Sequence, residues 1–131
     1  MEFELFEDQM DKYEYIIDLG KQAGALDEQY KIESNVVKGC QSTVWLHARG
    51  EGDFMIFQAD SNTVITRGII AILVRILSGQ RAEHILNDDF QFIEKIGLRA
   101  HLSSQRSNGL TAMMNRMKVE AALYLEQKNN L

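Results

Sequence analysis

Apolar and polar positions along the chain follow patterns that predict both helices and strands. Apolar side chains recur at helical spacing over roughly residues 6–23, which predicts an amphipathic helix. Residues 41–49 alternate between the two faces of a strand, a glycine-rich turn follows at 50–53, and a second apolar run spans 54–59. Two strands joined by a short turn form an antiparallel hairpin. Residues 30–32 are a candidate for a short first strand beside it.

The second half of the chain is predicted to be helical, beginning with a central helix at roughly 62–78. This stretch is apolar nearly all round, so we expect it to pack against the sheet, with its N-cap among residues 60–62. Gly68 costs a helix about 1 kcal/mol relative to Ala, and its presence here indicates close contact with another backbone. The stripe of this helix expected to face solvent is Thr63, Arg67, Ala71 and Arg75.

The remaining helices complete the predicted fold. Residues 81–87 and 89–96 are predicted to form short helices, and a last helix from about residue 104 carries methionines that we assign to the core. The whole pattern predicts a single α+β domain over residues 1–131, in which helices cover a small antiparallel sheet of about three strands. The tail from about residue 127 is expected to be flexible.

Composition and charge narrow the class of protein further. A chain of 131 residues with 45% hydrophobic and 25% charged residues is typical of one globular domain. The net charge of −5 argues against nucleic acid as a partner, because phosphate binding needs clustered Lys and Arg. The longest apolar run, residues 68–74, is too short to cross a bilayer, and the acidic start lacks the features of a signal peptide. We therefore expect a cytoplasmic protein that does not enter a membrane.

The only cysteine, Cys40, lies between a polar turn and the first strand of the hairpin. Most free cysteines fill small buried spaces, but Gly39 permits a positive φ and so favours a thiol presented at the tip of a loop. A single thiol cannot hold an iron–sulfur cluster or a structural zinc, nor act as a two-cysteine oxidoreductase. A nucleophilic thiol must lose its proton, and its pKa without help is about 8.5. Lys38 and Arg106 are candidate helpers, whereas Asp60 is interpreted as a helix cap.

Other roles for the thiol and its neighbours stay open at this point. A Cys–His hydrolase would need His101 or His47 as its base, and His84, in a polar helix, is a weaker candidate. The pairs Val36-Val37 and Val44-Trp45 flank the cysteine and could shelter a loop-borne thiol from irreversible oxidation. The chain has neither a dinucleotide-binding nor a P-loop glycine motif, which argues against a nucleotide cofactor.

The cysteine motif resembles the signature of the SufE family, the sulfur acceptors that work with cysteine desulfurases in iron–sulfur cluster assembly. The motif here is Gly39-Cys40-Gln41-Ser42-x-Val44-Trp45-Leu46. Further segments that resemble the family follow its order along the chain. They are Lys12-Tyr13, residues 17–21, Asp60-Ser61, residues 67–71, Gly97-Leu98, residues 101–103 and residues 106–113.

The resemblance implies a fold, a function and a set of partners. The fold would be SufE/IscU-like, an antiparallel sheet covered by helices. The chain would receive persulfide sulfur on Cys40 from a pyridoxal-phosphate-dependent cysteine desulfurase of the SufS type, stimulate that enzyme, and pass the sulfur to an iron–sulfur scaffold. It would be a sulfur carrier and not an enzyme in its own right, with no metal and no cofactor of its own, because the pyridoxal phosphate belongs to the desulfurase. The residues expected to support the thiol are Gly39, Gln41, Ser42, Lys38 and Arg106.

The sequence also departs from the family pattern, and alternative functions remain. Lys38 and Ser104 stand where the family often has proline, and Ala59 stands where glycine is common. None of these changes removes the thiol, although Lys38 makes the loop less rigid. The alternatives are a stand-alone cysteine-dependent hydrolase or peroxidase, and an adaptor that binds a desulfurase without using its cysteine.

Overall fold

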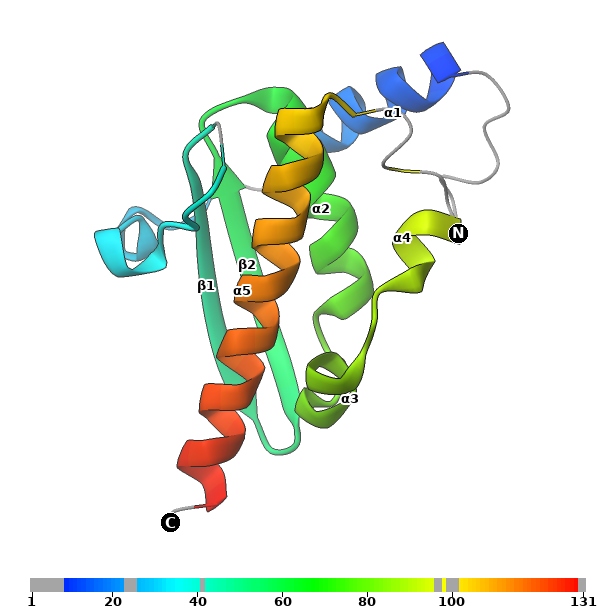
Figure 1. The fold of residues 1–131 in the computed structure, drawn as a ribbon. Helices are drawn as coiled ribbons and strands as arrows, with labels where there is room; N and C mark the ends of the chain where they lie inside the picture. Colours follow the sequence, from blue (N-terminus) through cyan, green and yellow to red (C-terminus); the bar gives the residue numbers. More distant parts are fainter. Residues whose placement is uncertain (1–8, 23–25, 41, 96–97, 99–101, 130–131) are drawn as a thin grey trace.

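The computed structural model describes residues 9–22, 26–40, 42–95, 98 and 102–129. The elements labelled in Figure 1, together with two short 3-10 helices (η), occur in the following order. They are α1 (Gln9–Gln22), η2 (Glu28–Tyr30), η3 (Glu33–Asn35), β1 (Val44–Glu51), β2 (Phe54–Ser61), α2 (Val64–Leu77), α3 (Ala82–Asn87), α4 (Gln91–Lys95) and α5 (Ser104–Asn129). This arrangement confirms the predicted α+β class.

The sheet is an antiparallel hairpin of β1 and β2, in which Leu46 lies opposite Ala59. Val44 and Leu46 are each 1% exposed, whereas on the opposite face of β1 Trp45 and His47 are half-buried and Arg49 is exposed, as the alternation predicted. Phe57 of β2 joins them on the buried face. A slip of one residue would turn this apolar set to the other face, so burial specifies the register. Gly52 in the turn takes a φ of 60°, which glycine adopts without strain.

The prediction of a short strand at residues 30–32 is wrong. Within the described residues the sheet has two strands, and the segment before the cysteine forms η2 and η3 instead. The side chain of Asn35 donates to Tyr30 O at 2.8 Å, so the chain turns back on itself and its backbone is satisfied locally. An isolated antiparallel β-bridge joins Val36 of this segment to Trp45 of β1.

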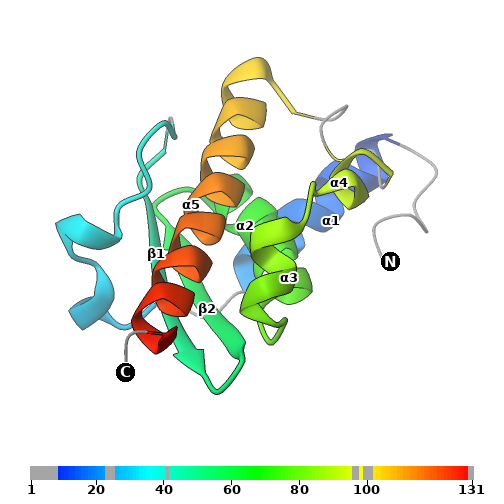
Figure 2. The ribbon, with the colours of Figure 1, turned by 60° about the horizontal axis from the view of Figure 1, so that its bottom comes forward.

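Helices cover the buried face of the hairpin (Figures 1 and 2). α2 packs on β2 and α5 on β1, while α1 lies against α2 and α3 lies against α5. A Cβ added at Gly68 would lie 1.9 Å from Ile16 O, and one added at Gly20 would lie 2.0 Å from Val64 O. The backbones of α1 and α2 therefore touch through two glycines, which confirms the close contact that Gly68 predicted.

Asp60 is a buried carboxylate of β2 and not a helix cap, so that interpretation is wrong. Only 4% of the residue is exposed. Its oxygens accept hydrogen bonds from the N–H groups of Leu26 (3.0 Å) and Ser61 (2.8 Å), and they pair with Arg67 at 3.1 Å and Lys31 at 3.4 Å. Desolvation opposes the charge, but these donors and cations outweigh it and hold the pKa of Asp60 below its usual value.

The helix that follows, α2, begins after Thr63, whose extended backbone marks it as the N-cap. The prediction that the N-cap lies among residues 60–62 is therefore wrong. Of the stripe predicted to face solvent, Thr63 and Arg75 are exposed, whereas Arg67 and Ala71 are half-buried. The pairing of Arg67 with Asp60 explains why this arginine lies against the protein instead of extending into water.

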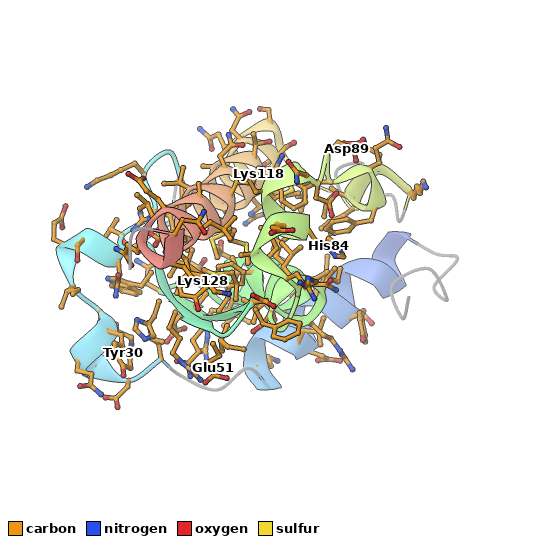
Figure 3. The ribbon with its side chains drawn as sticks, turned by 90° about the horizontal axis from the view of Figure 1, so that it is seen from below. Tyr30, Glu51, His84, Asp89, Lys118 and Lys128 are labelled. Atoms are coloured by element: carbon orange, nitrogen blue, oxygen red, sulfur yellow. The ribbon has the colours of Figure 1, made fainter. Side chains whose placement is uncertain are left out.

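The last helix, α5, supplies core residues along much of its length. Met113, Met114 and Met117 are at most 5% exposed, as their assignment to the core predicted. Residues 127–129, which we expected to belong to a flexible tail, form the last turn of α5, and Lys128 Nζ donates to Gly52 O at 3.0 Å. Lys128 lies at the hairpin end of the molecule, which faces the viewer in Figure 3. No helix in the described part of the chain is both long and apolar enough to span a membrane.

Candidate functional site around Cys40

Cys40 lies on a loop whose two ends are joined by backbone hydrogen bonding. The N–H of Val37 donates to Val44 O at 2.9 Å, and Cys40 lies on the loop that this pair closes. A turn at Lys38 and Gly39 leads into the cysteine, and Gly39 has a φ of 91°. This left-handed conformation is unfavourable for a side chain with a Cβ. The glycine before the cysteine thus shapes the loop that presents the thiol.

The thiol points toward the protein and is half-buried. Its Sγ donates a weak hydrogen bond to Gly109 O of α5 at 3.6 Å. Beside it lies a small cavity of about 30 Å³, room for roughly two water molecules. The apolar residues that line this cavity are Val44, Ile69, Ile70, Leu73, Leu110 and Met113. The shelter therefore comes from α2 and α5 together with Val44 of β1, and Val44 is the one member of the two predicted flanking pairs that lines the cavity.

Burial raises the pKa of the Cys40 thiol above its ordinary value. The cations proposed as helpers do not reverse this effect. Lys38 is exposed and pairs with Glu33 at 2.7 Å, on the outside of the loop. Arg106 of α5 does line the same cavity as Cys40. In this conformation the thiol is protonated near neutral pH, which suits a protected state better than a reactive one.

The far side of the loop is held by polar contacts to the start of α2. The hydroxyl of Ser42 shares a hydrogen bond with that of Thr63 at 3.0 Å and accepts another from Thr66 at 3.3 Å. Ser61 Oγ donates to Thr43 O at 2.8 Å. The expected support residue Gln41 lies outside the described residues. Both threonines were missed by sequence reasoning, because their contact with the loop depends on how β2 leads into α2.

Comparison with known protein families identifies the family of this chain. The family model described as SufE, Fe-S metabolism associated domain, matches residues 1–121. The chain belongs to the SufE family. Membership supports a sulfur-acceptor role in iron–sulfur metabolism, and it confirms the family that the cysteine motif indicated.

Curated relatives agree with this assignment. An uncharacterized SufE-like protein of Rhizobium meliloti (strain 1021) is 42% identical over 125 residues, which cover 92% of this chain and 89% of that protein. A second uncharacterized SufE-like protein, from Rhizobium etli, is 42% identical over 125 residues, covering 92% of this chain and 84% of that protein. SufE-like protein 1, chloroplastic/mitochondrial, of Arabidopsis thaliana is 41% identical over 118 residues, covering 89% of this chain but only 32% of that protein.

A solved structure supports the fold as well. The solution structure of a hypothetical protein from Thermus thermophilus aligns with a TM-score of 0.77 over 95% of this chain and 90% of that chain. The two sequences are 18% identical. At this identity the similarity concerns the fold alone, and it places the hairpin and its covering helices in a known arrangement.

Histidine positions in this SufE-family chain bear on the hydrolase alternative. His47 lies on the outer face of β1, where its ring stacks on that of Tyr30 with centroids 3.8 Å apart. His84 lies on α3, well away from Tyr30 in Figure 3, and His101 lies outside the described residues. Within the described residues, neither His47 nor His84 lines the cavity beside Cys40, and no group of three or more His, Cys, Asp or Glu is arranged to hold a metal ion.

Sequence reasoning also missed two residues of α5 that contact the cysteine segment. Gly109 accepts the hydrogen bond from the thiol. Arg116 Nη1 donates to Val36 O at 3.0 Å, eighty residues away in sequence. The sequence did offer one signal for Gly109. A glycine inside a helix lowers helix stability, so its presence indicates a close contact there. For Arg116 no such signal exists, because its role depends on where the helix packs.

Proposed function

We propose that this protein accepts sulfur from a pyridoxal-phosphate-dependent cysteine desulfurase, holds it as a persulfide on Cys40, and passes it to an iron–sulfur scaffold. The observation that carries the proposal is the position of the thiol. A SufE-family chain with a single cysteine holds that cysteine on a loop, against a mostly apolar cavity with space for an additional atom.

The transfer is a thiol–persulfide exchange that needs no outside oxidant. The Cys40 thiolate attacks the terminal sulfur of a persulfide on the desulfurase. A sulfur–sulfur bond forms on Cys40 as the donor's sulfur–sulfur bond breaks, and the donor cysteine leaves as a thiolate. The thiol proton of Cys40 goes to solvent. Sulfur keeps its oxidation level throughout, and one persulfide replaces another.

The cavity supports the holding step. A persulfide or thiolate exposed to oxidants climbs to forms that are not easily reversed. Apolar walls from α2 and α5 cover one side of the thiol, and burial raises the pKa of Cys40, which disfavours the reactive thiolate at rest. Of the residues we expected to form the shelter, Val44 lines the cavity, but Trp45 lies on the other face of β1, under the ammonium of Lys31. Transfer to and from a partner therefore needs the loop to open.

The identity of the partners follows from the same proposal. A desulfurase of the SufS type and an iron–sulfur scaffold are the partners that SufE-family membership favours. The cytoplasmic location stays a prediction, and one relative carries an organellar name.

The experiment that tests the function is mass spectrometry of the intact protein after incubation with cysteine and a SufS-type desulfurase. We expect a product one sulfur atom heavier, reversed by a reducing agent and mapped to Cys40. If the chain stays unmodified while it still accelerates the desulfurase, the adaptor alternative holds instead. Turnover of a substrate with no desulfurase present would favour the stand-alone enzyme.

A second prediction concerns access to the thiol. We expect Cys40 to react slowly with iodoacetamide in the free protein and faster, by about tenfold, when the desulfurase is bound, because docking must open the loop. The measurement is the alkylation rate by mass spectrometry with and without the partner. A desulfurase whose own cysteines are blocked serves as the binding partner, so that alkylation is counted on this chain alone. Equal rates would exclude gating by the partner.

A further inference from the structure

Arg116 of α5 binds the backbone of the segment that leads into the cysteine loop. Its guanidinium donates from Nη2 to Ser34 O at 2.5 Å and from Nη1 to Val36 O at 3.0 Å. From Nε it donates to Glu120 at 2.9 Å, a pair with the helical i, i+4 spacing. Because the guanidinium is planar, the bond from Nε to Glu120 also orients Nη1 and Nη2 toward the two carbonyl oxygens. All three bonds are charge-assisted, the stronger class of hydrogen bond.

These contacts are one end of a continuous stripe along α5. Residues 34–40, which we call the cysteine arm, run beside the helix in the opposite direction (Figures 1 and 2). Arg116 contacts the start of the arm. A Cβ built at Gly39 would lie 3.3 Å from the Cβ of Ala112, and Cys40 Sγ contacts Gly109 O at 3.6 Å. The three helix positions are three or four residues apart, so they share one face of α5.

The two ends of this stripe differ in strength. At the Cys40 end the contacts are a weak thiol hydrogen bond and a van der Waals contact at a glycine. At the Arg116 end they are two charge-assisted bonds to carbonyls, followed at once by Val37, which is 3% exposed and bonded to Val44 O. The Cys40 end of the arm is therefore held more weakly than the Arg116 end.

We propose that Arg116 is a positioning residue that anchors the base of the cysteine arm to α5, so that opening of the arm at Cys40 does not extend to residues 34–37 and Cys40 returns to its cavity. This inference rests on the proposed function, because a movement confined to the Cys40 end of the arm would carry the sulfur out to a partner and back. Without the anchor the arm would open along its whole length more often and expose the thiol more often.

The test is Arg116→Ala in the free protein, with Cys40 alkylation by iodoacetamide as the readout. We expect alkylation to be at least about tenfold faster than in the native protein, because the substitution removes both charge-assisted hydrogen bonds to the arm and losing one from a local opening equilibrium is already worth about that factor. The pH midpoint of the rate should fall, because burial is what raises the pKa of the thiol. The charged groups near Cys40 are Arg106 and the Lys38–Glu33 pair, and all three stay in place.

Two further variants separate positioning from general destabilisation. Arg116→Lys keeps the charge but not the planar fork, so it should give an intermediate rate. Glu120→Gln should give a smaller increase, because it weakens only the orienting contact. Arg49→Ala is the matched control: it removes an exposed arginine that pairs with Glu51 on the hairpin, and it should leave the rate unchanged.

Hydrogen exchange gives an independent measurement. The amide of Val37 should exchange faster in Arg116→Ala than in the control, since the anchor protects its bond to Val44. A native alkylation rate and pH midpoint in folded Arg116→Ala would overturn the inference. If that variant does not fold, a native rate in both Arg116→Lys and Glu120→Gln would overturn it equally. None of these measurements involves a desulfurase, so they stand or fall separately from persulfide transfer.

Discussion

Replacing Cys40 with serine should abolish both the sulfur adduct on this chain and its stimulation of a desulfurase. A serine oxygen cannot form a persulfide, and the chain has no second thiol to take over. The measurement is sulfide release by the desulfurase with reductant, compared with the native protein and with no added protein. We expect the Cys40→Ser protein to leave sulfide release at the level of the desulfurase alone.

The fold of the serine variant should be almost unchanged. Serine is smaller than cysteine, and its hydroxyl can donate to Gly109 O as the thiol does. We therefore expect a loss of free energy of unfolding of about 1 kcal/mol or less. Thermal unfolding of the same preparation provides the control. A folded variant that stimulates the desulfurase as the native protein does would refute the acceptor role, while an unfolded one would show that Cys40 is mainly a core residue.

Substituting Gly68 with alanine should destabilise the protein strongly. The added Cβ would lie 1.9 Å from Ile16 O, and a backbone oxygen cannot rotate away as a side chain can. α1 must therefore move off α2, which costs contacts along the whole helix pair. We expect a loss of about 3 kcal/mol in the free energy of unfolding, or roughly 10 °C in Tm. Denaturant and thermal unfolding both measure it.

Gly109→Ala is the matched control, because it makes the same chemical change in another helix. A Cβ there would lie 3.6 Å from Cys40 Sγ, an ordinary van der Waals distance. The gain in helix propensity then has no clash to offset it, so stability should stay within about 1 kcal/mol of the native value or rise slightly. Equal losses at Gly68 and Gly109 would show that the backbone contact between α1 and α2 is not what makes Gly68 necessary.

Much of the fold could be predicted because its signals are local. The alternation in β1, the turn at Gly52 and the apolar run of α2 each depend on residues close in sequence. Prediction was wrong where a local pattern competed with tertiary contacts. Asp60 has the sequence context of a helix cap, yet Leu26, Lys31 and Arg67 surround it and hold it in the sheet as a charged, buried group. Propensity cannot detect partners that lie far away along the chain.

The candidate site shows the same division. Cys40 and the positive φ of Gly39 were accessible from sequence, because one is the only thiol and the other precedes it in a polar turn. Lys38 does not help the thiol in this conformation, because its exposed ammonium pairs with Glu33 instead. The burial that raises the pKa of the thiol comes from walls on α2 and α5. No pattern around the cysteine contains that information.

The sequence by itself determined the family, the α+β class, the presence of the hairpin and the identity of the single thiol. Each of these depends on residue type and spacing, which burial and backbone geometry translate directly into structure. Only the tertiary structure decided that the thiol rests against a cavity, that Thr63 and Thr66 hold one side of its loop, and that Arg116 anchors the other. These contacts join segments up to about eighty residues apart, and their strength depends on distances that exist only once the helices pack on the sheet.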